Sequence, residues 1–182
     1  RNRCVRSSLG YTVAKMVKGL RQHGIYCRKS GLETVSIHLI TVAPPYRYRI
    51  EDITRPPSSL LYVGGYLKQH GLPVVVHHIV ESQIKSTVEE ILSDRELQYV
   101  GFSVMTGAQI ATSANISKTL KKVKKDLPIV WGGIHPSIMP KDTLDFPYVD
   151  FVVIGEGEIT ALELSKFILF QDDRQEKLED IL

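Results

Sequence analysis

The chain has few cysteines, no long apolar run and no strong net charge. Its 182 residues include 2 cysteines, too few for a disulfide framework or a cysteine-built metal centre, so a reducing, cytoplasmic setting is expected. No stretch approaches the roughly 18 apolar residues of a membrane-spanning helix, and the first residues lack the apolar core of a signal peptide. The sequence therefore predicts a globular domain without a membrane span.

The net charge of +3 conceals an uneven distribution, because residues 1–33 carry eight Lys/Arg and one acid. Within this basic segment Val13, Met16, Val17 and Leu20 recur at helical spacing, which predicts a short amphipathic helix. Such a helix could contact RNA or a membrane surface, or belong to a transit peptide. Packing against the domain edge or a partner is the favoured interpretation, since one short basic helix carries little specificity.

From residue 34 onward, apolar strands alternate with helices. Strands are expected at 34–42, 73–80, 99–105, 128–131 and 149–154, and helices at 58–69, 84–93, 108–125 and 158–170. This alternation predicts an α/β fold: a flavodoxin-like (Rossmann-like) open five-stranded parallel sheet of order 2-1-3-4-5, with helices on both faces. Residues 34–170 would form the domain, and residues 171–182 a charged tail or linker.

Ligands of such a sheet bind beyond the carboxyl ends of its strands, and the loops there exclude several ligand classes. The first loop, Pro44-Pro45-Tyr46, has neither the G-x-G-x-x-G of a dinucleotide site nor a P-loop, and it lacks the hydroxyls that a flavin phosphate would need. The later G-x-G is flanked by Glu156 and Glu158, which would repel phosphate. Met105 and Thr106 stand where a phosphate-accepting receiver domain has its aspartate.

The fourth strand ends in Gly132-Gly133, followed by Ile134-His135-Pro136. Two glycines leave backbone without side-chain bulk, so a large flat ligand could lie on it. A tight turn without any ligand is the alternative. Cobalamin fits the rim as a whole, because it is large, touches backbone and needs few charged partners.

Four features resemble the cobalamin-binding domain that precedes the radical S-adenosylmethionine (SAM) domain of cobalamin-dependent radical SAM enzymes. Residues 56–71 are similar to its P-P-x-x-L-x-Y-L-A-x-Y-L-x-x-x-G helix, residues 100–106 to its V-G-I-S-x-x-T strand, and residues 149–158 to its V-D-x-V-V-x-G-E-G-E segment. The glycine pair follows Met105 after 26 residues, a spacing similar to that of the family. Residues 1–33 match no part of it.

The resemblance implies a binding mode. The corrin ring would lie across the strand ends, and the nucleotide tail would enter between the first helix and the strand-four loop, with Ser103 as a hydrogen-bond partner and Gly132 and Gly133 making room. The cofactor-binding residues expected on this basis are Pro45, Ser58, Leu60, Ser103, Val104, Met105, Thr106, Gly132, Gly133, Ile134, His135, Glu156 and Gly157. No catalytic residue and no metal ligand is expected.

Two departures from known patterns refine the expectation. Ser58 stands where other cobalamin domains place a cobalt-ligating histidine in D-x-H-x-x-G, so the lower axial position should be open or hold water, as is common in the radical SAM subgroup. The C-x-x-x-C-x-x-C motif of the iron–sulfur cluster is missing, because Cys4 and Cys27 precede the domain. The cluster and SAM would belong to a partner domain, C-terminal in the parent protein or on a separate chain.

The sequence therefore predicts a cobalamin-binding domain, the N-terminal part of a radical SAM methyltransferase or related enzyme, that is not catalytic alone. The alternative is a non-catalytic α/β interaction or regulatory module that kept the fold without the corrin. His77 and His78 point to opposite faces of a strand, so they are interpreted as structural. The lysines of residues 118–125 are interpreted as a solvated helix face, which makes nucleic acid an unlikely partner.

Overall fold

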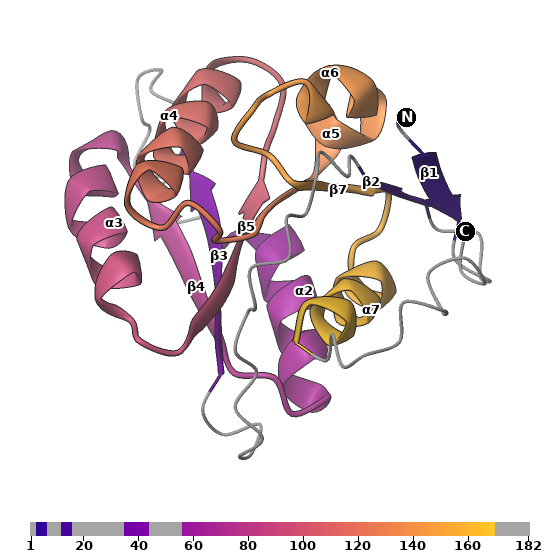
Figure 1. Cartoon of the computed structure of the whole chain (residues 1–182), viewed down its shortest axis with the longest axis horizontal. Coiled ribbons are helices and arrows are strands. Elements are labelled where there is room, and N and C mark those ends of the chain that lie inside the picture. Colours follow the sequence, from indigo (N-terminus) through magenta and orange to yellow (C-terminus); the bar gives the residue numbers. More distant parts are fainter. Residues whose placement is uncertain (1–2, 7–11, 16–34, 44–55, 170–182) are drawn as a thin grey trace.

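A seven-stranded sheet runs through the computed structural model, which describes residues 3–6, 12–15, 35–43 and 56–169 (Figure 1). The strands are β1 (Arg3–Arg6), β2 (Thr12–Lys15), β3 (Ser36–Val42), β4 (Val74–Ile79), β5 (Leu97–Ser103), β6 (Ile129–Gly132) and β7 (Phe151–Ile154). Their spatial order is β1-β2-β7-β6-β5-β3-β4. Strands β3 to β7 pair in parallel, and this part has the predicted order 2-1-3-4-5 when β3 is counted as the first strand.

Helices cover both faces of the sheet. They are α2 (Ser58–Gln69), α3 (Ile84–Ser93), α4 (Ala108–Val123), α5 (Ile134–Ile138), α6 (Pro140–Leu144) and α7 (Glu158–Leu169), with a 3-10 turn η2 (Glu81–Gln83) before α3. Figure 1 shows α3 and α4 on one face and α2 and α7 on the other. The short helices α5 and α6 were not predicted. Their prolines look like helix breakers in the sequence, but Pro140 occupies the first turn of α6, where a proline is tolerated.

The two faces have separate apolar cores, because alternate residues of each strand point to opposite sides. On β3, Ile40 packs with the α3 and α4 side chains, whereas Ile37 and Leu39 pack with those of α2 and α7. Trp131 is fully buried in the first core, and its Nε1–H donates to Ser117 Oγ at 3.1 Å. Burying each such apolar side chain contributes roughly 1.5–3 kcal/mol.

The structure contradicts part of the predicted N-terminal helix. Thr12–Lys15 form the strand β2, which pairs antiparallel with β7 and also with β1. Without β2, strand β7 would be an open edge whose N–H and C=O groups lack ladder partners, and the β-branched Thr12 and Val13 suit a strand. Residues 16–34 lie outside the described residues, as does the predicted tail at 171–182. Among the described residues, no helix is both long and apolar enough to cross a membrane.

Candidate functional site

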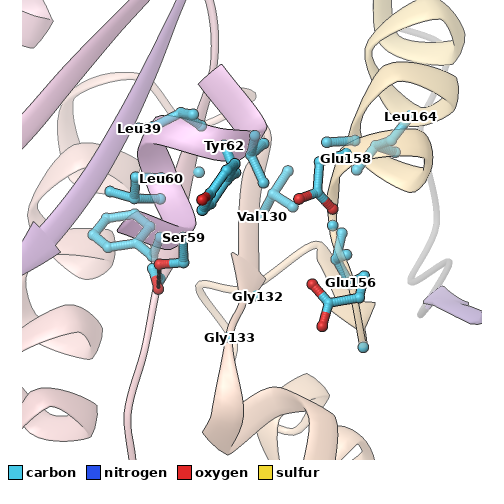
Figure 2. Close-up of a pocket in the computed structure, with 18 of the residues that line it drawn as sticks. Leu39, Ser59, Leu60, Tyr62, Val130, Gly132, Gly133, Glu156, Glu158 and Leu164 are labelled. Carbon is cyan, nitrogen blue, oxygen red and sulfur yellow. Dashed lines mark hydrogen bonds between the residues drawn. The ribbon is translucent and has the colours of Figure 1, made fainter. Parts of the chain in front are cut away.

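A cleft opens at the carboxyl ends of the strands, between α2 and α7 on one face of the sheet (Figure 2). Its volume is ≈ 760 Å³ including the open mouth. Side chains of the sheet and of both helices form its apolar surface, among them Leu39, Leu60, Val130, Val153, Ala161 and Leu164. The cleft therefore has the shape of a slot that a flat apolar group could enter from the rim.

Two glycines keep the floor of this cleft low. A Cβ atom at Gly101 would lie 2.7 Å from Cδ2 of Leu39, so the missing side chain on β5 lets Leu39 lie across the neighbouring strand. At Gly132 a Cβ would meet only ordinary contacts, the nearest being Val153 Cβ at 3.6 Å. Gly132 points to the same face of β6 as Val130, so a larger side chain there would project into the cleft.

Gly133 has a different role from Gly132. Its φ is +96°, and a Cβ would lie 3.0 Å from the backbone N of Val104 and 3.2 Å from Ser103 Oγ. Hydrogen bonds hold the two loops at this distance, from Val104 N–H to Gly132 O at 2.9 Å and from His135 N–H to Val104 O at 3.0 Å. The close approach and the positive φ both require glycine.

Two serine hydroxyls meet at the mouth of the cleft. Ser59 Oγ on α2 and Ser103 Oγ at the end of β5 are 3.1 Å apart, and Thr41 Oγ1 donates to the carbonyl of Ser103 at 3.2 Å. Ser103 thus lines the cleft, where its hydroxyl meets that of Ser59. The predicted Ser58 does not line the cleft, and its hydroxyl lies 3.4 Å from the carbonyl of Pro56.

The loop between β7 and α7 completes the rim. Gly155 has a φ of +77°, its N–H donates to Ser137 Oγ at 3.0 Å, and Ser137 Oγ donates to the carbonyl of Gly133 at 2.7 Å. Glu156 and Glu158 follow at the mouth, and Figure 2 shows their carboxylates on the α7 side. No lysine or arginine lines the cleft within the described residues, so its mouth is acidic and can accept hydrogen bonds from amide groups.

The structure divides the predicted site residues into two groups. Those that line the cleft are Leu60, Ser103, Gly132, Gly133, Glu156 and Gly157. Met105, Thr106 and Ile134 are exposed beside the mouth but do not line the cleft. Val104 is fully buried in the core of the opposite face, because the chain turns it away from the cleft as β5 ends. Pro45 lies outside the described residues.

The wall residues of the cleft were missed by the sequence analysis. They include Ser59, Tyr62 and Val63 on α2, and Glu158, Ala161 and Leu164 on α7. Their spacing of three or four residues within each helix is a signal that could have found them, since such residues share one helical face. Tyr62 is 70% exposed although it lines the cleft, which is unusual for a large aromatic side chain.

No histidine among the described residues lines the cleft. His135 is buried, and its Nδ1 has no hydrogen-bond partner in the described part of the chain. His38 is buried on the α3 and α4 face, as is its partner His77. The structural interpretation of His77 is consistent with this position.

Part of this chain is similar in sequence to two curated proteins. The chain is 27% identical over 130 residues to an "uncharacterized methyltransferase" of Pyrococcus horikoshii. The alignment covers 69% of this chain and 28% of that protein. It is 29% identical over 126 residues to an anaerobic magnesium-protoporphyrin IX monomethyl ester cyclase of Rubrivivax gelatinosus, covering 62% of this chain and 22% of the cyclase. The chain thus spans less than a third of these curated relatives.

A solved structure has the same fold. A cobalamin-binding protein from Desulfitobacterium hafniense superposes with a TM-score of 0.53 at 14% identity, over 74% of this chain and 58% of that one. Residues 54–165 match the family of B12-binding domains, and this range contains α2, the first part of α7, the glycine pair and both serines of the cleft. Since the match extends over more than half of the chain, the protein belongs to the B12-binding domain family.

Proposed function

We propose that this chain holds cobalamin for a radical SAM partner domain and is the N-terminal part of a radical SAM enzyme, a methyltransferase or a related enzyme. The cleft between α2 and α7 is the observation that carries the proposal, together with Gly132, whose Cβ would enter it. Bound cobalamin supplies a cobalt centre able to carry a methyl group or an electron. The protein residues position that group and shield part of it from water.

The residues of the cleft fit the nucleotide tail of cobalamin. Its dimethylbenzimidazole base is flat and apolar, like the slot formed by Leu39, Val130 and Leu164. The hydroxyls of Ser59 and Ser103 offer a hydrogen bond at the mouth. The exposed Met105, Thr106 and Ile134 beside the mouth would contact the corrin, and the carboxylates of Glu156 and Glu158 would accept hydrogen bonds from its amide side chains.

We further propose that no protein histidine binds the cobalt. Ser58 stands at the position expected for that histidine, and a serine hydroxyl is a poor cobalt ligand. His38 and His77 are hydrogen-bonded to each other on the far face of the sheet. His135, whose main chain is at the rim, is the one remaining candidate near the mouth in the described part of the chain, and its side chain is buried.

Titration with hydroxocobalamin, followed by the visible spectrum, tests both statements. We expect a stable red complex with a spectrum that lacks protein imidazole coordination, and the same spectrum from His135→Ala. A histidine-ligated spectrum that disappears in His135→Ala would overturn the axial assignment alone. Absence of any complex would favour the second function, an α/β interaction module that kept the fold without the corrin.

The division of labour with a partner domain has its own test. Cys4 and Cys27 are the two cysteines of this chain, and no group of three or more potential metal ligands is found among the described residues. We expect no iron–sulfur absorbance after reconstitution with iron and sulfide, and no cleavage of SAM. A stoichiometric cluster on this chain, or 5′-deoxyadenosine formed by it, would contradict the proposal.

A further inference from the structure

The inner part of the cleft offers no free polar side chain. Away from its mouth, the lining side chains are aliphatic or aromatic, and include Leu39, Val63, Val130, Val153, Ala161 and Leu164. The polar side chains of the lining are those of Ser59, Ser103, Tyr62, Glu156 and Glu158. Ser59, Ser103 and the two glutamates are at the mouth, where α2 and α7 begin and β5 ends, and Tyr62 is 70% exposed. A group that enters deeply therefore meets only apolar atoms.

Tyr99 also lines the cleft, but its hydroxyl is buried and hydrogen-bonded to α7. Its Oη is 2.8 Å from Ser165 Oγ, and Ser165 Oγ donates to the carbonyl of Ala161 at 2.6 Å. Tyr99 is 2% exposed, and burial raises the pKa of this phenol to about 12, so it stays protonated. With Ser165 donating to Ala161, the Tyr99 hydroxyl donates in turn to Ser165.

The backbone N–H and C=O groups on the floor of the cleft are also hydrogen-bonded already. The floor residues Leu39, Gly101 and Val130 lie on β3, β5 and β6, and at each of them the strand pairs in parallel with both of its neighbours. Their N–H and C=O groups are therefore engaged within the sheet plane. The strands of the inner cleft therefore offer no acceptor to an incoming N–H group. The oxygen of Tyr99 keeps lone pairs, but it is buried against Ser165 of α7 and turned away from the ligand space.

Because the inner cleft is apolar and offers no acceptor, we infer that it selects among cobamides by their lower base. It would accept benzimidazoles and discriminate against purines such as adenine. The inference rests on the proposed function, since it concerns the base of the bound nucleotide tail. A benzimidazole has no exocyclic polar group, whereas adenine carries an amine whose two N–H groups would lose water and find no partner. An unpaired buried donor is costly, and we expect adeninylcobamide to bind about ten- to a hundredfold more weakly than cobalamin.

Tyr62 contributes affinity but not this selectivity. It lines the cleft from α2 and is 70% exposed, and it is labelled among the lining residues in Figure 2. Its ring can stack on a flat base. Because benzimidazole and adenine both present an aromatic face, the discrimination depends on the exocyclic amine.

Three ligands that share one corrin ring test the inference on the unmodified chain. They are cobalamin, adeninylcobamide and cobinamide, which lacks the nucleotide base, and their dissociation constants are measured by spectral titration. We expect cobalamin to bind at least about tenfold more tightly than each of the other two. The variant Val130→Thr, which adds a hydroxyl to the floor with little change in shape, should reduce the preference of the cleft for cobalamin over adeninylcobamide.

Val75→Thr is the matched control, because Val75 is 40% exposed on the edge strand β4, away from the cleft. It should leave the preference unchanged. Equal affinities for cobalamin and adeninylcobamide would overturn the inference while the proposed function stands, and so would cobinamide binding as tightly as cobalamin. Failure of all three to bind would instead refute the proposed function. If Val130→Thr does not fold, the three-ligand comparison alone still decides.

Discussion

His38 and His77 lie ring against ring in the interior, with Nδ1 of His38 2.8 Å from Nε2 of His77. Their ring planes are 13° apart and their centroids 5.0 Å apart. The other nitrogen of His38, Nε2, lies 2.9 Å from Asp94 Oδ2, and Asp94 also accepts hydrogen bonds from Ser36 Oγ and from the backbone N–H of Glu96. These two imidazoles and the carboxylate join β3, β4 and the C-terminal end of α3, on the face opposite to the cleft.

The first prediction concerns stability at acid pH. Burial, followed by the charge of His38, lowers the pKa of His77, and Glu90 opposes this only in part. The folded protein therefore keeps His77 neutral at a pH where the unfolded chain, with the ordinary value of 6.5, has bound a proton. The free energy of unfolding should be highest above this value and fall as the pH decreases below it.

Asp94 extends this loss of stability to lower pH. Burial would raise the pKa of Asp94, but hydrogen bonds from Ser36, from His38 and from the Glu96 N–H outweigh it and hold the pKa below its ordinary value of 3.8. The contribution of Asp94 is thus present above that value and lost in stronger acid.

Urea unfolding of the chain and of His77→Gln over a series of pH values measures the effect of His77. His70→Gln, at an exposed position, should keep the parent slope, and an unchanged slope in His77→Gln would contradict the assignment.

The second prediction separates the cleft from the fold at Gly132. Gly132→Leu should weaken cobalamin binding by about a hundredfold or more, because the leucine side chain would occupy the slot used by the base. The fold should persist, since the nearest atom to a Cβ there is at 3.6 Å. Gly65→Leu is the control, because a Cβ at this exposed helical position meets no atom within 4 Å. Spectral titration and thermal melting of both variants give the answer, and a Gly132→Leu chain that binds normally would show that the cleft is not the cobalamin site.

The third prediction concerns Gly133, where even a methyl group is too large. Gly133→Ala should destabilise the fold by roughly 1–3 kcal/mol, through the positive φ and the 3.0 Å approach to the Val104 backbone. Gly65→Ala should instead stabilise the protein by about 0.5–1 kcal/mol, because alanine is the better helix former. Urea unfolding measures both. Equal stabilities for the two variants would mean that the loops can move apart at little cost.

The fourth prediction concerns the N-terminal segment. The composition break near residue 33 predicts that deleting residues 1–33 leaves the domain folded with its cobalamin affinity little changed. The structure modifies this expectation, because the deletion also removes β1 and β2 and leaves the edge of β7 unpaired. We expect retained affinity, a lower melting temperature and greater self-association, as measured by spectral titration, thermal melting and sedimentation velocity. A monomer as stable as the full chain would show that β2 adds little to the sheet.

The parallel sheet could be predicted because its signals are local. The helix at 58–69 follows a proline pair and ends before Gly71, and its predicted bounds match α2. The helix at 84–93 likewise matches α3. Apolar runs between such signals placed the five strands to within a few residues.

The site was less predictable, because it depends on the rotation of helices and on pairing over long distances. Ser58 was predicted because it stands where other cobalamin domains place the ligating histidine. Which of the first residues of α2 faces Ser103 depends on the rotation of the helix, and it is Ser59 that lines the cleft. Ala161 and Leu164 share one face of a helix by their spacing, but that spacing alone does not tell a residue that lines a cleft from one that packs in the core. The strand β2 was predicted as a helix, because its partner β7 lies at the other end of the chain.

That long-range pairing also sets an order of events during synthesis. The register joins Thr12 to Ile154 and Lys15 to Phe151, so β2 cannot pair with β7 until the ribosome has made all of the strands that lie between them in the sequence. Pairs of such large sequence separation form slowly. The strands β1 and β2 are therefore made well before β2 can join the sheet, whereas β3, β4, β5 and β6 can pair with one another earlier. The pairing of β2 with β7 completes the sheet.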